Sequence, residues 1–325
     1  LSANFAPVDE LPPTPCPVVR GAIPRCLAGG AYIRNGPNPQ HLPRGPHHLF
    51  DGDGMLHSLL LPTAESPSSD PILCSRYVQT YKYLVERDAG APVMPNVFSG
   101  FHGLAGLARG AVVAARVLTG QMNPAEGVGL ANTSLVFFSG QLFALGESDL
   151  PYTVRVDPAT GELVHACVEK VRINLRTGAV SRTPLSAGNL DFGVIHPGYL
   201  GRRNRYGYFG IGDPMPKIGG VAKLDFDLAG TGDCTVARRD FGPGCFGGEP
   251  FFVPDDVEGG KSGNEDDGYV VCYVHNERTG EDRFVVMDAR SPQLDIVAEV
   301  QLPARVPYGF HGLFVTQAEL QAQQQ

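Results

Sequence analysis

The second half of the chain alternates short apolar runs with glycine-containing turns. Beyond residue 130, runs such as "TSLVFFSGQLFAL" and "INLRTGAV" place β-rich segments on either side of a break. The breaks fall at residues 139–140, 157–161, 177–178 and 279–280, and three of them contain a Thr-Gly pair. This spacing predicts consecutive β-hairpins. Their number over this length favours a β-propeller, whose blades are meanders of about four strands, over a β-sandwich.

One stretch departs from this pattern and predicts a helix. Residues 101–119 read "FHGLAGLARGAVVAARVLT", with large apolar residues among small ones and with Arg109 and Arg116 on one face. Two interpretations stay open: a surface helix packed on the core, or an interfacial helix that dips into lipid and holds its arginines at the headgroups. Because no run of 18 uncharged apolar residues occurs, the sequence predicts no membrane-spanning helix.

Three polar stretches are predicted to be loops or turns. Asp51-Gly52-Asp53-Gly54 lies between apolar runs, and a tight hairpin turn is favoured there. A calcium loop is the alternative, but the stretch lacks the spaced acids and the final glutamate of such loops. The glycine-rich residues 209–220 and the acidic residues 254–268 are predicted to connect strands. No domain boundary is visible, so residues 1–325 are predicted to form a single domain.

Composition and charge narrow the possible functions. Glycine (41) and proline (28) are abundant while 42% of the residues are hydrophobic, which indicates many turns around a substantial core. The net charge of −8 and the lack of a basic tract argue against nucleic acid as a partner. The seven cysteines form no CxxC, which favours a reducing compartment over a zinc site or a disulfide scaffold. Because the first residue is Leu1, any targeting peptide is expected upstream.

The nine histidines form no HExxH or HxH motif. His275 and Glu277 form one H-x-E, which together with His311 would supply two histidines and a carboxylate to a ferrous ion. Short motifs of this kind arise by chance, and Glu277 is expected to face solvent because it begins a turn. His311, in "VPYGFHGLFV", is by itself an isolated histidine, for which a hydrogen-bonded core position is the simplest interpretation.

Several long stretches, in order along the chain, resemble segments of one enzyme family. They are "AYIRNGPNP", "HHLFDGDGMLH", "LANTSLVFFSGQLFALGESDLPY", "NLDFGVIHPGYLGRRNRYGYFGIGDPMPKIGGVAKLD", "FGGEPFFVP", "EDDGYVVCYVHNERTG" and "VPYGFHGLFV". On these motifs the chain resembles the carotenoid cleavage dioxygenase family, and in detail its plant 9-cis-epoxycarotenoid dioxygenase group, especially the plastoglobule-type subfamily. The resemblance covers nearly all 325 residues.

The resemblance implies an all-β fold, a seven-bladed β-propeller with a helical cap. It implies one Fe(2+) held by four histidines, whose outer ring nitrogens donate to three carboxylates that fix ring orientation. The expected reaction adds O2 across a conjugated double bond of a carotenoid or apocarotenoid and gives two carbonyl products. The expected location is the chloroplast or another plastid. Peripheral contact with a plastid membrane or plastoglobule is expected through residues 101–119.

Four site residues follow from the resemblance. His311 matches the last iron ligand, and Glu147 and Glu249 match two of the three carboxylates. Asp191 falls where many members have the third, a glutamate, and its shorter side chain makes that hydrogen bond less secure. No other catalytic residue is implied. The remaining histidines of the matching motifs, His48, His57 and His196, are not at ligand positions, and the first two are expected in the core or in turns.

The chain also departs from the family pattern. Three ligand segments, which in the family read like "TAHPK", "HDFAIT" and "HxxNAWE", do not occur. "YTVRVDPATGEL" runs directly into "VHACVEKVRINLRTGAV", so an internal deletion is predicted near residues 163–165, worth roughly two to three blades. One imidazole cannot hold Fe(2+) against water, so iron binding and carotenoid cleavage are predicted to be impaired. The alternatives are a non-catalytic remnant that binds carotenoid or membrane, and a shortened propeller that misfolds.

Overall fold

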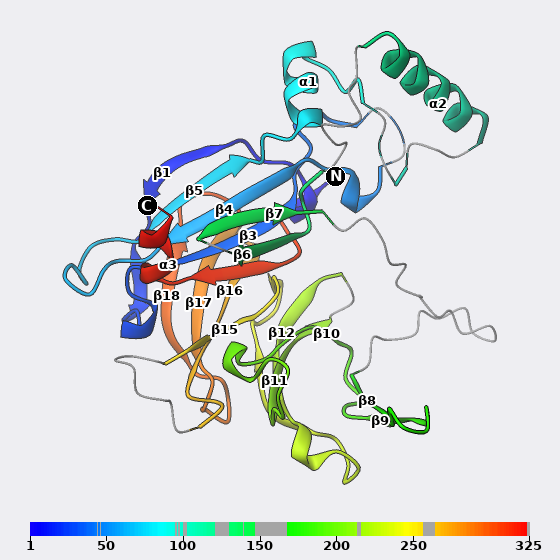
Figure 1. Ribbon diagram of the computed structural model, residues 1–325. Coiled ribbons are helices and arrows are strands. Elements are labelled where there is room, and N and C mark those ends of the chain that lie inside the picture. The colour runs from blue at the N-terminus through cyan, green and yellow to red at the C-terminus, as the bar shows by residue number, and fades with distance from the viewer. Residues whose placement is uncertain are drawn as a thin grey trace.

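The computed structural model describes residues 1–43, 45, 47–94, 96, 98–99, 103–120, 130–138, 140–146, 168–212, 216–255 and 264–323. Most of the elements in these residues are antiparallel strands, and the helices are few and short (Figure 1). The all-β prediction is therefore confirmed.

A five-stranded sheet joins the two ends of the chain. Its strand order is β1 (Leu11–Pro15), β5 (Ile72–Tyr77), β4 (Gly54–Leu60), β3 (Ala31–Pro37) and β19 (Gly312–Val315). Each neighbouring pair is antiparallel, and β19 lies against β3 with Gly312 opposite Arg34. Since β3 and β19 stand near opposite ends of the sequence, this pairing ties the N-terminal region to the C-terminal region, as in a ring of blades.

A ten-stranded sheet follows the rest of the chain. Its path is β10 (Leu190–Val194), β11 (Tyr206–Gly212), β12 (Ile218–Asp225), β14 (Cys245–Gly247), β16 (Gly268–Asn276), β17 (Glu281–Asp288), β18 (Ile296–Leu302) and β2 (Val18–Gly21). Strand β13 (Thr235–Asp240) pairs with β12, and β15 (Phe251–Pro254) pairs with β16. The N-terminal strand β2 thus completes the C-terminal meander β16–β17–β18.

Two hairpins form two-stranded sheets of their own, without backbone pairing to these larger sheets. One pairs β6 (Ser134–Phe138) with β7 (Gln141–Leu145), and the other pairs β8 (Glu169–Ile173) with β9 (Val180–Pro184). The hairpins predicted around residues 139–140, 177–178 and 279–280 are confirmed. Glycine serves each turn because it accepts positive φ, for example +72° at Gly178 and +74° at Gly280. The hairpin predicted at 157–161 lies outside the described residues.

The main core lies between the five-stranded sheet and the meander β16–β17–β18. Its largest fully buried side chains include Tyr32, Leu59 and Phe284, with the Tyr32 and Tyr273 rings 5.0 Å apart. The alternation of buried and exposed positions along β16 and β17 is weak because both of their faces are covered. This explains their nearly continuous apolar sequences.

The described residues include three α-helices: α1 (Tyr81–Ala89), α2 (Gly103–Leu118) and α3 (Gln317–Ala322). The predicted helix at 101–119 is thus confirmed within the described residues. Helix α1 was not predicted, although the sequence carries the signals of a helix there. Thr80 caps its N-terminus by accepting from the Tyr83 N–H, and Gly90 ends it at φ +62°.

The part of the chain that the structure describes also contains five single turns of 3-10 helix. They are η1 (Ala3–Phe5), η2 (Arg25–Leu27), η3 (Leu49–Asp51), η5 (Pro197–Tyr199) and η6 (Phe226–Leu228). No helix in the described part of the chain is both long and apolar enough to span a membrane. No disulfide joins the cysteines in these residues.

The hairpin turn predicted at Asp51-Gly52-Asp53-Gly54 is wrong. Asp51 ends η3, and β4 begins only at Gly54, so the loop between β3 and β4 spans residues 38–53. Both carboxylates are buried and accept hydrogen bonds: Asp51 from the backbone N–H groups of Phe98 and Ser99, and Asp53 from the Lys82 ammonium. They act as internal acceptors because loop donors and a lysine converge on them, which also leaves them no role as a calcium site.

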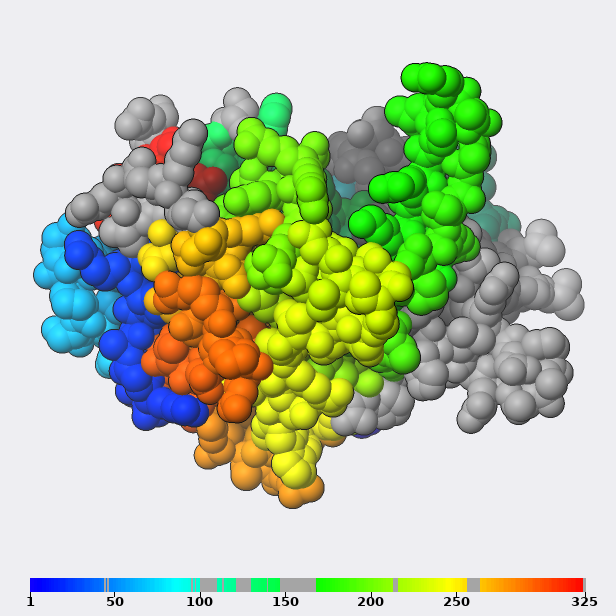
Figure 2. Space-filling model, turned by 90° about the horizontal axis from the view of Figure 1, so that it is seen from below, coloured from blue at the N-terminus to red at the C-terminus, as the bar shows by residue number. Residues whose placement is uncertain are grey.

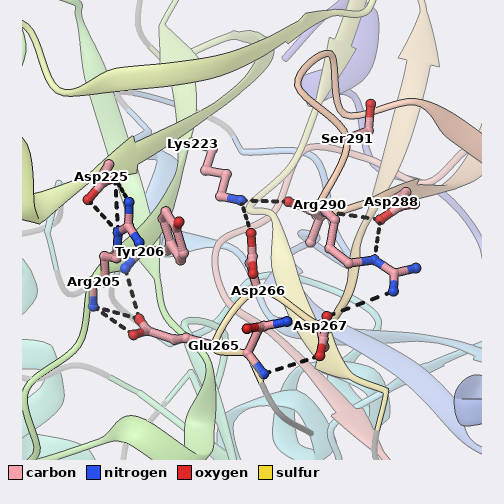
Figure 3. Close-up of polar contacts among 12 residues, drawn as sticks. Arg205, Tyr206, Lys223, Asp225, Glu265, Asp266, Asp267, Asp288, Arg290 and Ser291 are labelled. Carbon is pink, nitrogen blue, oxygen red and sulfur yellow. Dashed lines mark hydrogen bonds and ion pairs between the residues drawn. The ribbon is translucent and has the colours of Figure 1, made fainter.

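The end of the predicted acidic loop at 254–268 is fixed by backbone N–H groups at the start of β11 and by a lysine of β12 (Figure 3). The Glu265 carboxylate accepts the backbone N–H groups of Arg205 and Tyr206 at 2.8 Å. The Lys223 ammonium donates to Asp266 at 2.6 Å and lies 4.1 Å from the centre of the Tyr206 ring. The described part of this loop therefore connects β15 to β16 and binds β11 and β12, as a strand-connecting segment should.

Candidate functional site

His311 lies just before β19 and is 36% exposed at its side chain. Its Nδ1 is 2.9 Å from Oε1 of Glu249, which comes from the segment between β14 and β15. The His311 backbone is held on both sides, since its N–H donates to the Thr133 carbonyl and its carbonyl accepts from Asn35 N–H. Three separate parts of the chain therefore position this imidazole.

Glu249 is 7% exposed at its side chain and uses both of its oxygens. Oε2 accepts the backbone N–H of Gly312 at 2.8 Å, while Oε1 faces His311 Nδ1. The Tyr32 hydroxyl donates to the Glu249 carbonyl at 3.4 Å. The carboxylate thus has a fixed orientation, which in turn sets the plane of the imidazole.

This geometry determines the His311 tautomer. A carboxylate only accepts hydrogen bonds, so Nδ1 carries the proton in the Glu249 contact. In the neutral ring Nε2 is then the nitrogen with a lone pair. An imidazole held in this way by a carboxylate is the arrangement that proteins use for metal-bound histidine.

The described hydrogen bond of the Asp191 side chain does not go to a histidine. Its Oδ1 accepts the backbone N–H of its own neighbour, Phe192, at 2.8 Å. Phe192 has φ +52°, a left-handed conformation that is strained for this residue type. Its ring centre lies 6.1 Å from that of His311 in an edge-on arrangement. Asp191 therefore supports the irregular part of strand β10 where the register with β11 shifts and where the Phe192 ring approaches that of His311.

The structure thus brings together two of the four residues that the resemblance implied, His311 and Glu249, and places Asp191 one residue away from a neighbour of His311. Glu147 lies outside the described residues, as does the join at 163–165. Phe192 was missed by sequence reasoning. Its only signal was its place directly after Asp191 in "NLDFGV".

The H-x-E motif does not form an iron site in the structure. His275 is buried and its Nδ1 lies 2.8 Å from Asp282 Oδ2. Glu277 pairs with the Lys217 ammonium at 2.7 Å and accepts from the Tyr308 hydroxyl. Its side chain is 21% exposed, so it faces these partners more than the expected solvent. The two side chains point to different partners because β16 ends at Asn276, between them.

His48, His57 and His196 behave as structural residues. His48 caps η3 by accepting from the Phe50 N–H, and His196 caps η5 by accepting from the Gly198 N–H. His57 is 3% exposed and lies opposite Arg34 in the β3–β4 ladder. Burial, and after it the positive charge of Arg34, lowers the pKa of His57 to about 3. His57 is therefore neutral at physiological pH. Its predicted core position is confirmed, but neither ring nitrogen has a hydrogen-bond partner among the described residues, so a hydrogen-bonding role is not.

A buried charged cluster that the sequence did not indicate holds α1 against β4. Lys82 donates to Asp53 and to Glu86, each at 2.8 Å, and all three side chains are at most 5% exposed. Burial alone would lower the pKa of the Lys82 ammonium, but the two carboxylates outweigh it and raise the pKa. Since Glu86 also accepts the Met94 N–H, the cluster positions the loop that follows α1.

The described residues contain no group of three or more His, Cys, Asp or Glu side chains arranged to hold a metal ion. His311 with Glu249 supplies one imidazole and one carboxylate that is already hydrogen-bonded to it. Ferrous sites in proteins use three or more ligating side chains. The described part of the chain does not by itself fit an iron ion.

Comparison with known proteins gives the context for this site. The family profile of retinal pigment epithelial membrane protein matches residues 5–167 and 161–316. A chloroplastic 9-cis-epoxycarotenoid dioxygenase of Oryza sativa subsp. japonica is 56% identical over 491 aligned positions, which cover 100% of this chain and 77% of the relative. The probable carotenoid cleavage dioxygenase 4 of Arabidopsis thaliana, also chloroplastic, is 44% identical and covers 98% of this chain and 81% of the relative.

This chain belongs to the carotenoid cleavage dioxygenase family. Two solved structures share the fold at low identity. A lignostilbene dioxygenase of Pseudomonas brassicacearum has a TM-score of 0.71 at 16% identity, and a variant of Synechocystis apocarotenoid oxygenase has 0.69 at 16%, each covering 97% of this chain and 98% of that one. The propeller architecture of the family is therefore the architecture of this chain.

The alignment also records a difference within the family. It spans 491 positions, whereas this chain has 325 residues, so at least 166 positions of the Oryza dioxygenase alignment have no counterpart here. The two stretches matched by the family profile meet at residues 161–167. These residues follow the described hairpin β6–β7 and precede β8.

Proposed function

We propose that the site around His311 is what this chain retains of the iron centre of a carotenoid cleavage dioxygenase. The reaction of such a centre is the Fe(2+)-dependent oxidative cleavage of a conjugated double bond, with O2, in a carotenoid or apocarotenoid to give carbonyl products. The observation that carries the proposal is the 2.9 Å contact of His311 Nδ1 with Glu249, the carboxylate–imidazole arrangement that orients metal-binding histidines. Family membership supports the substrate class.

The chain as it stands is proposed to be impaired in this reaction. Three of the four ligand segments expected from the resemblance do not occur in the sequence. A single imidazole binds Fe(2+) weakly, because water competes for each remaining coordination position. The loss is proposed to come from an internal deletion near residues 163–165 within a single domain, where the two matched stretches of the family profile meet.

The proposed location is the plastid, and the proposed membrane contact is α2. The relatives named above are chloroplastic, which supports the compartment. On α2, Val112 is 53% and Leu118 is 87% exposed, so apolar side chains are available to a plastid membrane or plastoglobule surface. Arg116 donates to the Val93 carbonyl, which ties it to the protein and leaves the apolar residues to make the contact.

The proposal is tested by iron content and product formation in the same preparations. The chain, its His311→Ala variant and the intact Oryza relative are purified with added ferrous salt, and iron is measured by mass spectrometry. Each is then incubated with β-carotene and with a 9-cis-epoxycarotenoid, and carbonyl products are separated by chromatography. We expect iron far below one ion per chain, unchanged by His311→Ala, and no products except from the relative. One iron per chain that is lost in His311→Ala, with products, would refute the impairment.

A second candidate is a non-catalytic protein that binds carotenoid or membrane. The exposed apolar residues of α2 favour it over an inert remnant. A visible carotenoid absorption band that co-purifies with the chain in the absence of iron would support this candidate. A colourless preparation that does not bind plastid-lipid vesicles would refute this candidate.

A further inference from the structure

The β6–β7 hairpin is apolar on both faces but packed on only one. Its inward face, with Leu135 and Ala144 among its residues, contacts Ile33 and Val315 of the five-stranded sheet. Its outward face carries four large apolar side chains that are exposed by 38% to 71%: Val136, Phe138, Phe143 and Leu145. Strands apolar on both faces are normally covered on both faces. A layer that should cover the outward face is therefore missing from the described residues.

The β8–β9 hairpin also has an uncovered apolar face, and its side chains are more exposed. One of its faces carries Val171, and the directly opposed pair Ile173 and Val180, each more than half exposed. Leu175, in the turn, is 95% exposed. Figures 1 and 2 show this green hairpin standing away from the body of the molecule. A two-stranded hairpin of this kind is at best marginally stable without further strands or a packing partner.

The two hairpins are also incomplete at their edges. Within the described residues β6 pairs only with β7, and β8 only with β9, whereas the other sheets have five and ten strands. Unpaired strand edges present rows of N–H and C=O groups that seek partners. Both hairpins flank the same point of the chain, where residues 161–167 join the two matched stretches of the family profile.

We propose that the outward face of β6–β7 and the apolar face of β8–β9 form a docking surface for the blades that relatives carry between these hairpins, supplied by a separate polypeptide. The inference rests on the internal deletion proposed above. At about 45 residues per blade, the 166 or more unmatched positions correspond to three blades or more. Such a segment offers strands to both open edges and apolar faces to both hairpins.

Two other occupants fit these observations less well. Lipid would cover the apolar side chains but would leave the N–H and C=O groups of the open edges without partners. A second copy of this chain lacks the same blades. It would carry its own two uncovered hairpins, so a dimer would still have hairpins without partners. The missing blades would both cover the exposed apolar faces and pair with the open strand edges.

The test is assembly from two polypeptides. This chain is co-expressed with a tagged middle segment of the Oryza dioxygenase, chosen as the residues that have no counterpart here, and the complex is isolated through the tag. We expect a one-to-one complex by native mass spectrometry. Amide hydrogen exchange is expected to slow at least tenfold in residues 134–145 and 169–184, with little change in 268–288 of β16–β17.

Surface variants provide the matched control. Phe138→Asp and Ile173→Asp, at exposed positions on the two hairpins, are expected to weaken the complex at least tenfold. Leu200 is 72% exposed directly after η5, away from both hairpins in the sequence. Leu200→Asp is expected to leave the affinity of the complex unchanged. A thermal melt like that of the unmodified chain shows that each variant still folds.

Four outcomes would overturn the proposal: no complex, a complex insensitive to Phe138→Asp and Ile173→Asp, self-association of the chain in place of segment binding, or protection of the hairpins by lipid vesicles but not by the segment. The assay needs no iron, so it is independent of the proposed function. A complex that forms but retains no iron and cleaves no carotenoid supports the docking surface and refutes the iron site. Iron binding without a complex does the reverse.

Discussion

The substitution Glu249→Gln tests how the His311 ring is held. Glu249 accepts two hydrogen bonds, from Gly312 N–H at 2.8 Å and from His311 Nδ1 at 2.9 Å. Glutamine has the same shape but offers one accepting oxygen and one donating NH2 group. Because the Gly312 N–H can only donate, the amide oxygen must face it. The NH2 group then faces Nδ1, which has to become an acceptor, so the proton of the neutral ring moves to Nε2.

The size of the stability change follows from the same contacts. Hydrogen bonds to a charged acceptor contribute about 1.5–3 kcal/mol, and neutral ones about 0.5–1.5 kcal/mol. Two such bonds are weakened, but His311 is 36% exposed and water compensates for part of its bond. We therefore expect Glu249→Gln to lower the free energy of unfolding by about 1–2 kcal/mol. Glu249→Ala also leaves the Gly312 N–H without this acceptor and should cost more, about 2–4 kcal/mol.

The tautomer is measured by NMR of protein with 15N-labelled histidine, and the stability by urea denaturation. The His311→Ala variant identifies the His311 signals among those of the nine histidines. In the unmodified chain the Nδ1 resonance should be that of a protonated nitrogen, and in Glu249→Gln that of an unprotonated one. Retention of the Nδ1 proton in Glu249→Gln, or equal losses of stability in the glutamine and alanine variants, would refute this account of the pair.

Three further predictions concern residues that hold the site's surroundings. Burial depresses the pKa of His57 to about 3, so its contribution to stability is complete above its unfolded pKa of 6.5 and is lost as the pH falls toward 3. Urea denaturation should therefore show about 2 kcal/mol less loss between pH 7 and pH 5 in His57→Gln than in the unmodified chain. Lys82→Met leaves the buried carboxylates of Asp53 and Glu86 without their cation, and should lower the free energy of unfolding by about 3–5 kcal/mol. Gly54→Ala places a Cβ 2.3 Å from the Ala131 carbonyl oxygen, so the backbone must shift, at about 1–3 kcal/mol.

The Lys82 and Gly54 predictions each have an internal control. Arg203→Met removes an exposed ion pair with Asp227 and should change stability little, in contrast to Lys82→Met. Gly110 lies in α2 with open space around its Cβ position, so Gly110→Ala should stabilise by about 0.5–1 kcal/mol where Gly54→Ala destabilises. Equal effects within either pair, or an unchanged pH slope in His57→Gln, would contradict the burial and packing argued here.

Local patterns predicted the elements whose geometry depends on neighbouring residues. The loops "NLRTG" and "NERTG" each use an asparagine, Asn174 or Asn276, whose side chain accepts the N–H groups two and three residues on. A glycine at positive φ then closes each turn. Contacts of this kind join residues only a few positions apart in the sequence. The hairpins and α2 could therefore be predicted from local sequence. The local pattern at Asp51-Gly52-Asp53 misled, because its partners, Phe98 and Lys82, come from distant segments.

The strand-and-turn character of this chain, its family resemblance and the pairing candidates His311 and Glu249 can all be read from the amino-acid sequence. Three contacts follow only from the folded chain: Glu249 with His311, the Asp191 carboxylate with the Phe192 N–H, and β19 with β3. The physical reason is the range of the interactions. Turn geometry and helix capping act over a few residues, whereas a buried carboxylate takes whichever donors the packing of distant strands brings within about 3 Å.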